Sequence, residues 1–595
     1  MPIIIIIFSA RILEITLPFG GMGIAMRNYF ISLFITLTLL LSACQPLQQS
    51  SATASDFNTL TDELFSASVT SDSLTLNYTL SNPAAYSIDD LPQGFSCLSQ
   101  EQEKKNNMET ENIRQRLHTI DKQSLSTKNK ILYDTLEDTL QQQLSYEKCT
   151  SLATALNPSS GIQAQLPVLL SEFTIEDMSD LSQYFALLNS LPAYFQSLIE
   201  WEQEKIQTNT VLCQATWQHI IVQCQDFIYK DGKKAIQRRF EEQLQTLPQI
   251  DIDKEKILKK HTKLLQEKVL PAYQNMIRQC QKLKEQAPFD GALAAYPNGK
   301  TYYEYLFRQK TGSSDTVLHW QSRLTKKLLQ AEKTLLTITA KNPAILRTSE
   351  ERLPVSETPA TLLTSLYRKM QADFPSCQQT SCQIRYVDSS LEDYLSPAFY
   401  LVPPIDRTDN NTIYINNASK YRHTSLYNTL AHEGYPGHLY QNCYLRGQNL
   451  PPLRYILDYP GYTEGYATYA EIYAYRYTGG SKDEITVLQQ NAIANHCLYA
   501  LCDIGIHYEH WSLEKLKHFL AKHGVYTEET ATILYETIID SPGSYLPYTI
   551  GYWEIEQLKN YYFRLHSNAT DKDFHTYLLN MGPTSFAILK KYCIE

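Results

Sequence analysis

The chain has 595 residues and a mass of 68.4 kDa, which is long enough for several domains of ordinary size. Hydrophobic residues make up 43% and charged residues 19%, with 21 Gly and 26 Pro, which excludes collagen-like, low-complexity and wholly disordered proteins. The net charge is −10 at pH 7, and no basic block is present. We therefore expect no nucleic-acid partner.

The N-terminal segment predicts export and lipid attachment. Residues 1–25 do not resemble an export signal, whereas a better one starts at Met26, with Arg27 for positive charge and an apolar run over residues 29–41. This run is shorter than the roughly 20 residues that a membrane-spanning helix needs. It ends in the letters LSAC, and small residues before Cys44 resemble the lipobox of bacterial lipoproteins, in which cleavage leaves a lipidated cysteine at the new N-terminus.

We therefore expect residues 1–43 to be removed, with Met26 as the true start. Residues 44–56 are small and polar, as suits a tether, and would carry lipid on Cys44. The alternative is a short membrane anchor that is not cleaved. The prediction is a lipoprotein of the cell membrane whose folded part lies outside the cytoplasm.

Helical patterns dominate the remaining sequence. Apolar residues at spacings of three and four recur in long, charge-rich stretches, over residues 101–146, 181–204, 254–286 and 317–338. Strand patterns are few, and they lie at residues 383–387, 398–402 and 412–415, with turn residues between them. Because the helical pattern returns from residue 424, we predict a mainly α fold with a small β-sheet.

The segment after these strands holds two histidines around a glutamate, in the letters HEGYPGH. In the zinc-peptidase motif HExxH the histidines are four residues apart on one helical face and share a metal. Here His432 and His438 are six apart, and six residues turn a regular helix by about 600°, which puts the rings on different faces. Pro436 and Gly437 lie between them and favour a break in the helix, which would allow a shared metal. Taken alone, the two could equally be surface or core histidines.

A glutamate downstream completes a possible ligand set. Glu464 opens a helical pattern, and two imidazoles with one carboxylate and an open fourth position form a catalytic zinc site. Glu471 is seven residues further on the same face, where it could orient a histidine. The alternative is a solvated pair of glutamates on a helix rich in Ala and Tyr.

These motifs resemble the bacterial domain-of-unknown-function family 885, predicted zinc metallopeptidases of largely helical fold. HEGYPGH and EGxAxYAE are followed in the same order by three further similar stretches, DIGIHYEHW from Asp503, PGSYLPYTIG from Pro542 and MGP from Met581. The resemblance is dense from about residue 396 to the end. This chain has His496 and Tyr499 where the family often has arginines, and Ser544 where glutamine is usual, so substrate specificity is not carried over.

The resemblance implies Zn²⁺ on His432, His438 and Glu464. It implies Glu433 as the general base, which would take a proton from zinc-activated water and pass it to the leaving amine. Tyr548 and His507 lie in matched motifs and are candidates for the donor that stabilises the tetrahedral intermediate. We favour Tyr548, because a phenol stays a donor at neutral pH, although each could instead be a hydrogen-bonded core residue.

We also predict how the parts of the chain are arranged. We place Asp503 with Glu471 behind the zinc ligands, and we expect a gluzincin-like metallopeptidase fold with the sheet beside the active-site helix. Residues 57–300 would form an N-terminal helical part and residues 301–595 the catalytic part. The strand at 412–415 could be an edge on which an extended peptide pairs.

The predicted function is hydrolysis of peptide bonds in short extracellular oligopeptides by a lipid-anchored zinc peptidase. One alternative is a peptide- or solute-binding lipoprotein without turnover, which would be expected to lose Glu433, although this residue is present. The other is a metal-dependent hydrolase of a different amide or ester. The sequence does not distinguish exo- from endo-cleavage and gives no oligomeric state.

Overall fold

The computed structural model describes residues 53–594, except 231, 248–252, 355–356, 378–380, 390–391, 393–395, 408, 410, 419–424 and 526. The predicted signal segment and Cys44 lie outside the described residues, as does most of the tether. In the part of the chain that the structure describes, no helix combines the length and the apolar character needed to cross a membrane.

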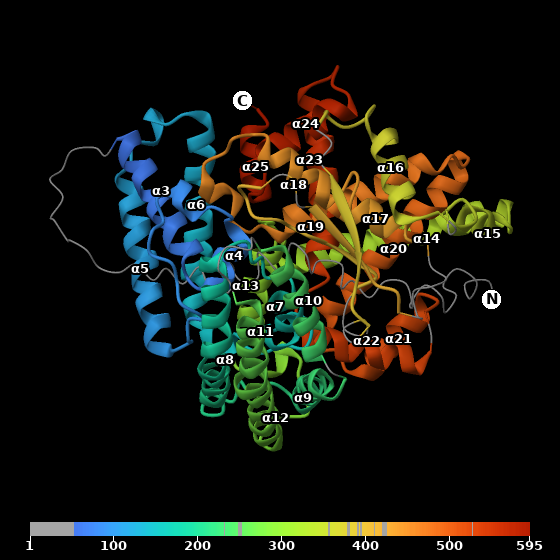
Figure 1. The fold of residues 1–595 in the computed structure, drawn as a ribbon. Coiled ribbons are helices and arrows are strands. Elements are labelled where there is room, and N and C mark those ends of the chain that lie inside the picture. The colour runs from blue at the N-terminus through green and yellow to red at the C-terminus, as the bar shows by residue number, and fades with distance from the viewer. Residues whose placement is uncertain are drawn as a thin grey trace.

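Helices build the first half of the molecule (Figure 1). They are α3 Ala54–Val69, α4 Ser73–Thr79, α5 Gln100–Thr119, α6 Thr127–Tyr146, α7 Ile162–Ser171, α8 Met178–Glu204, α9 Gln214–Tyr229, α10 Gly232–Thr246, α11 Lys254–Leu264 and α12 Leu270–Glu285. The predicted helical stretches are confirmed, with two interruptions. The stretch 101–146 divides before Asp121, whose side chain accepts from the Gln123 N–H and caps a short 3₁₀ turn. A π-helical turn at Leu265–Val269 separates α11 from α12.

The second half is also mainly helical and contains the three strands of the sheet. Its helices are α13 Gly299–Thr311, α14 Val317–Lys341, α15 Ile345–Glu350, α16 Pro359–Met370, α17 Tyr427–Glu433, α18 His438–Arg446, α19 Pro460–Ala474, α20 Lys482–His507, α21 Leu513–Lys522, α22 Glu528–Asp540, α23 Leu546–Leu565, α24 Asp571–Met581 and α25 Phe586–Tyr592. The strands are β1 Cys382–Tyr386, β2 Ala398–Leu401 and β3 Asn411–Ile415. The predicted mainly α fold with a small β-sheet is confirmed.

The order of the strands corrects one prediction. The sheet runs β1-β3-β2, so β3 is the central strand: it pairs parallel with β1, Ile384 opposite Ile413, and antiparallel with β2, Phe399 opposite Tyr414. The prediction that residues 412–415 form an edge for a peptide is therefore wrong, because both sides of β3 are already paired. Among the described residues, the unpaired edges of the sheet belong to β1 and β2.

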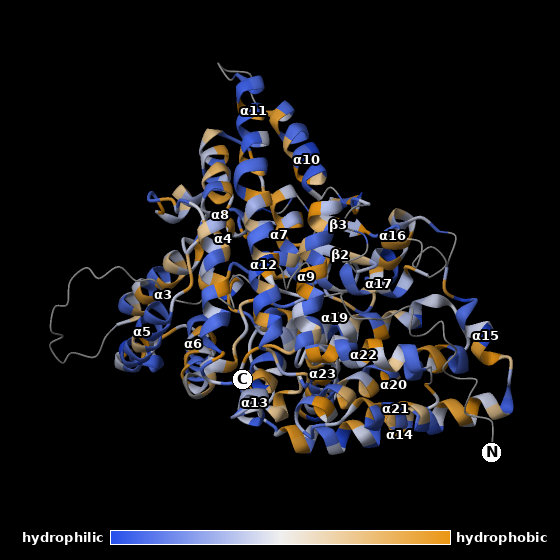
Figure 2. Ribbon diagram, turned by 90° about the horizontal axis from the view of Figure 1, so that it is seen from below, coloured by the Kyte–Doolittle hydropathy of each residue, from blue (hydrophilic) through white to orange (hydrophobic). Residues whose placement is uncertain are grey.

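Two hydrophobic cores lie on opposite faces of the sheet. Because successive side chains of a strand point to opposite faces, Tyr400 and Ile413 join a first core with α13, α17, α19 and α23, whereas Phe399 and Tyr414 join a second core with α7 to α12. Figure 2 shows α10 and α11 of the second core projecting from the body of the molecule. The first core draws on both sides of residue 300, and the division of the chain there stays a prediction.

Three glycines allow α19 and α23 to cross at backbone contact. A Cβ on Gly551 would lie 2.0 Å from the carbonyl oxygen of Gly461, and a Cβ on Gly465 would lie 2.5 Å from the backbone of Gly551. Only glycine fits such an approach. The crossing matters for the site, because Glu464 precedes Gly465 on α19 and Tyr548 lies one turn before Gly551 on α23.

Candidate metal centre

The helix breaks between the two histidines, as the sequence predicts. α17 ends at Glu433 and α18 starts at His438. The peptide bond before Pro436 is cis, and a Cβ on Gly437 would lie only 1.8 Å from the carbonyl oxygen of His432, so the chain can turn back there only with glycine. The turn brings the rings of His432 and His438 together, edge to face, with centroids 4.8 Å apart.

Both imidazoles meet the carboxylate of Glu464. Glu464 Oε2 lies 3.5 Å from His432 Nε2 and 3.3 Å from His438 Nε2. All three side chains are buried, and one ligand atom from each lies within 4.8 Å of the others. Among the described residues, this is the only group of three or more His, Cys, Asp or Glu residues with the spacing of a metal site.

The carboxylate of Glu464 is shared between the two imidazoles, and this sharing affects the pKa of all three groups. Burial alone would raise the pKa of Glu464, but His438 and His432 outweigh it and lower the pKa to about 2. Burial opposes the charge on His432, yet its contacts with Glu464 and Glu471 raise its pKa to about 10. Burial lowers the pKa of His438 despite Glu464. Among the protein groups alone, the carboxylate is ionised and one imidazole carries the compensating proton.

Glu433 lies beside the cluster, and one of its carboxylate oxygens has no hydrogen-bond partner. Its Oε2 accepts a hydrogen bond of 2.9 Å from the backbone N–H of Tyr400 on β2, while Oε1 is buried without a hydrogen-bond partner. Burial raises the pKa of Glu433 to about 8, although His432 and the Tyr400 N–H oppose the shift. Since this N–H of β2 points away from β3, the free edge of β2 faces α17.

Two further predicted residues lie where they could serve the cluster. Glu471 Oε2 is 3.3 Å from His432 Nδ1, so it holds the ring nitrogen that does not face Glu464. The ring of Tyr548 is stacked near that of His432, with centroids 6.0 Å apart. Together with Glu464, Tyr548 also lines a cavity of about 420 Å³.

His507 lies elsewhere, which corrects its predicted role. Its Nδ1 accepts from the Leu293 N–H at 3.2 Å, and its Nε2 donates to the Ile538 carbonyl at 2.8 Å. The side chain is fully buried, and burial lowers its pKa to about 4, so it is a neutral core residue. Both nitrogens are used by backbone groups because His507 ends α20 between two other elements, and no donor remains for a substrate.

Asp503 also differs from its predicted place behind the ligands. Its carboxylate accepts from the hydroxyl of Tyr303 at 2.5 Å and from the N–H of Gly543 at 3.0 Å. It therefore anchors the loop that leads into α23, and it acts on Tyr548 only through the position of that helix.

The cavity at Glu464 reaches far into the N-terminal half. Its walls include Trp201 and Tyr305 as well as Thr463, Glu464 and Tyr548. Lys310 on α13 also lines it. Lys310 was not identifiable from the sequence, since a single lysine in an amphipathic helix carries no local signal. The N-terminal helices thus form one wall of the space beside the cluster.

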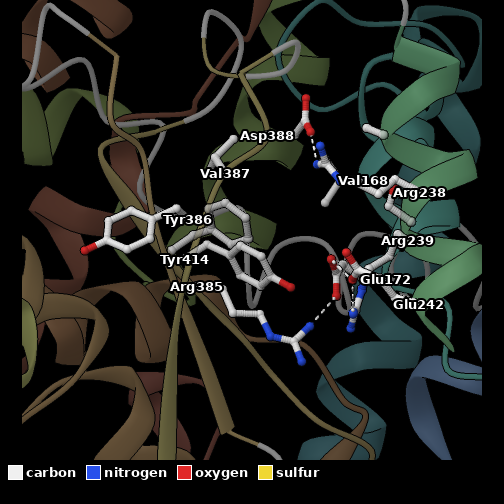
Figure 3. Close-up of a pocket in the computed structure, with 13 residues that line it drawn as sticks. Val168, Glu172, Arg238, Arg239, Glu242, Arg385, Tyr386, Val387, Asp388 and Tyr414 are labelled. Carbon is white, nitrogen blue, oxygen red and sulfur yellow. Dashed lines mark hydrogen bonds and ion pairs between the residues drawn. The ribbon is translucent and has the colours of Figure 1, made fainter. Parts of the chain in front are cut away.

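A second cavity, of about 450 Å³, lies on the opposite face of the sheet (Figure 3). Its charged side chains pair with one another: Arg385 lies 3.4 Å from Glu172, and Arg239 lies 2.9 Å from Glu242. Arg238 pairs with Asp388. We call it the arginine cavity, and none of the three metal-binding candidates lines it.

Comparisons with known proteins place the chain in a family. Two solved structures share the fold: a "putative lipoprotein from Colwellia psychrerythraea", with a TM-score of 0.78, 18% identity and coverage of 91% of this chain and 98% of that one, and a "putative lipoprotein of unknown function from Shewanella oneidensis", with a TM-score of 0.65, 15% identity and coverage of 92% and 100%. None of the curated proteins matches the chain. A family model described as "Bacterial protein of unknown function (DUF885)" matches residues 92–592, so the chain belongs to this family, as its motifs predict.

Proposed function

We propose that the chain is a zinc peptidase that hydrolyses short extracellular oligopeptides. The observation that carries this proposal is the convergence of His432, His438 and Glu464 on one point beside Glu433. Two imidazoles and one carboxylate are the ligand set of gluzincin-type catalytic zinc sites, which leave one position open. We propose in addition that the fold around these ligands is similar to that of gluzincin-type metallopeptidases.

The spacing of the ligand atoms fits a zinc ion better than a direct hydrogen bond. Ligands at about 2.0–2.1 Å from a tetrahedral zinc ion lie about 3.3–3.4 Å from one another. The two distances from Glu464 Oε2 are 3.3 and 3.5 Å, whereas charge-assisted hydrogen bonds are usually about 2.7–2.9 Å long. His432 Nε2 makes no hydrogen bond and has only this 3.5 Å contact with Glu464, an incomplete pairing that a metal ion would replace with a ligand bond.

The neighbouring side chains supply the groups that hydrolysis needs. A bound zinc ion lowers the pKa of water and acts as a Lewis acid toward a carbonyl oxygen. Glu433 can take a proton through Oε1 and pass it to the leaving amine, while the Tyr400 N–H fixes its other oxygen. The Tyr548 hydroxyl can donate to the oxygen on which negative charge develops, and Glu471 orients His432.

The enzyme would act outside the cytoplasm, attached to the membrane through lipid on Cys44. The export signal from Met26 and the letters LSAC before the tether support this location. The lipoprotein descriptions of the two solved structures named above agree with it.

The experiment uses soluble protein from Gln45 onward, incubated with a mixed peptide library and analysed by mass spectrometry. Wild type is compared with Glu433→Gln, and zinc content is measured on both. Glu255→Gln, at an exposed position of α11, is the matched control. We expect cleavage by wild type and by the control, and loss of cleavage with zinc retained in Glu433→Gln.

Other outcomes would replace the proposal. Equal cleavage by wild type and Glu433→Gln would remove Glu433 from the chemistry. Zinc at unit stoichiometry without peptide cleavage would favour a hydrolase of another amide or an ester. Peptide binding with neither zinc nor cleavage would favour a binding lipoprotein.

A further inference from the structure

Lys310 lies close to the candidate zinc ligands although it is far from them in sequence. It occupies the last turn of α13 and lines the same cavity as Glu464 and Tyr548. The carbonyl oxygen of Thr311 would lie 1.9 Å from a Cβ on Gly461, so the end of α13 touches the first turn of α19. Glu464 follows Gly461 by one helical turn, which places Lys310 in the part of the cavity next to the cluster.

Lys310 is the one basic side chain among the residues that line this cavity, whereas four lining residues are acidic, Glu103, Asp458, Glu464 and Asp540. Asp540 is already paired with His219, at 2.6 Å. Among the residues that the structure describes, Lys310 Nζ has neither a hydrogen bond nor an ion pair within 4 Å, so its donors are available to a ligand.

The lysine is held in place, and two nearby carboxylates partly offset the effect of burial on its charge. Its aliphatic stem packs on Gly543, where a Cβ would come within 3.0 Å of Lys310 Cδ. Burial lowers the pKa of Lys310, while Asp503 and Asp458 oppose that shift. An ammonium group in a partly enclosed site, without a protein carboxylate in contact, binds an anionic ligand more strongly than it would in water.

The remaining wall suits the body of a short peptide. Aromatic side chains from both halves of the chain line the cavity, among them Tyr146, Trp201, Tyr302 and Tyr305. A volume of about 420 Å³ lies at the lower end of the range of small-molecule sites, about 300–1,000 Å³. A few amino-acid residues would fill it, and a folded protein would not enter.

We propose that Lys310 binds the C-terminal carboxylate of the substrate, so that the enzyme is an exopeptidase that cuts a fixed number of residues from a free C-terminus. This inference rests on the proposed peptidase function. Hydrolysis adds one water across the peptide bond: the new carboxylate takes the hydroxyl, and the released C-terminal fragment takes the proton on its amine. Lys310 is a specificity residue in this scheme, since it contacts the substrate away from the bond that breaks.

The test compares peptides that differ only at the C-terminus, one with a free acid and one with an amide. Wild type should cleave the acid with a kcat/KM about 10- to 100-fold above that of the amide, the effect of one charged hydrogen bond. Lys310→Met should remove this preference through a higher KM for the acid, and Lys310→Arg should keep most of it. Lys300→Met, an exposed position on the same helix, is the matched control and should behave as wild type.

Equal cleavage of acid and amide by wild type, or a preference that survives in Lys310→Met, would overturn the inference and leave the peptidase function intact. The same pairs are also titrated into Glu433→Gln by calorimetry, with and without Lys310→Met. A preference for the acid that depends on Lys310 would support the assignment even if no variant cleaves peptides, in which case the proposed function fails alone. Equal binding of acid and amide would overturn the assignment.

Discussion

Two cavities of this protein have nearly the same volume, about 420 and 450 Å³, but opposite chemistry. In the arginine cavity, Glu172 is shared between Arg385 and Arg239, so the charges are already paired with one another. In the cavity beside the cluster, Lys310 makes no ion pair among the described residues, and Oε1 of Glu433 nearby is buried without a hydrogen bond.

The difference teaches where a ligand is expected. A buried charged group without an ion pair is destabilising, so it persists where something else completes it. A set of closed ion pairs contributes to stability and leaves little for a ligand to bind. The following predictions test this contrast, beginning with the largest expected effect.

The contrast predicts opposite outcomes for two Glu→Gln exchanges. Glu433→Gln should lower turnover by about 10²- to 10⁴-fold, the usual contribution of a general base. Glu172→Gln should leave turnover unchanged and lower the free energy of unfolding by about 1 kcal/mol, because it weakens part-buried ion pairs. Peptide-cleavage assays measure the turnover of each variant, and thermal unfolding measures its stability. Loss of turnover in Glu172→Gln would break the contrast.

Zinc binding should depend on His438 and not on another buried histidine. His438→Ala removes a ligand and should weaken zinc binding by more than about 100-fold, the upper range for loss of a supporting residue. His261→Ala is the control, because its ring nitrogens pair with Tyr184 and Gln237 and it should lose only stability, about 1–3 kcal/mol. Competition with a chelator measures the affinities. Equal zinc affinity in His438→Ala and wild type would exclude this ligand.

Loss of the group that orients His432 should have a smaller effect on the metal. Glu471→Gln keeps the shape of the side chain but weakens the contact with His432 Nδ1, at 3.3 Å. We expect zinc affinity to fall by about 10- to 100-fold. Titration with zinc against a chromogenic chelator would show this, and a wild-type affinity would mean that Glu471 does not hold the ring.

The helix crossing should be sensitive to a single methyl group. Gly551→Ala places a Cβ against the backbone of Gly461 and should destabilise the protein by about 1–3 kcal/mol while separating Tyr548 from Glu464. Gly447→Ala, at an ordinary backbone conformation, should change stability by less than about 0.5 kcal/mol. Thermal unfolding compares them, and equal stability of the two variants would contradict the close crossing.

The smallest predicted effect concerns pH and Asp503. Burial raises its pKa to about 7, against the hydrogen bonds from Tyr303 and Gly543. A raised pKa means that the folded state holds the proton more tightly, so this stabilisation is complete below about pH 4 and is lost as pH rises to about 7. Relative to Asp503→Asn, wild type should lose stability across this window. Parallel Tm curves for both proteins would contradict the shift.

Local features of the fold were predictable because their causes are local. The period of the apolar residues gave the long helices, and alternation with turn residues gave the three strands. Pro436 and Gly437 predicted the break between the histidines for a steric reason that needs no tertiary information. The proposed ligand set came from residue types, spacing and family resemblance together.

Features set by distant contacts were not predictable. The position of β3 between β1 and β2 depends on pairing across the chain, so residues 412–415 were wrongly expected at an edge. In the sequence, Tyr548 and His507 were both possible donors to the substrate. The packing of α23 on α19 places Tyr548 near His432, whereas His507 contacts backbone groups. Lys310 reaches the cavity through the contact of α13 with α19, which no local pattern reveals.

The most direct test of a catalytic zinc in this protein is a crystal structure with anomalous diffraction measured on both sides of the zinc absorption edge. We predict one zinc peak, within about 2.0–2.2 Å of Nε2 of His432, Nε2 of His438 and Oε2 of Glu464, with Glu433 beside the open position. A crystal grown with zinc that shows no peak at these three atoms, from protein that still cleaves peptides, would contradict the proposed site.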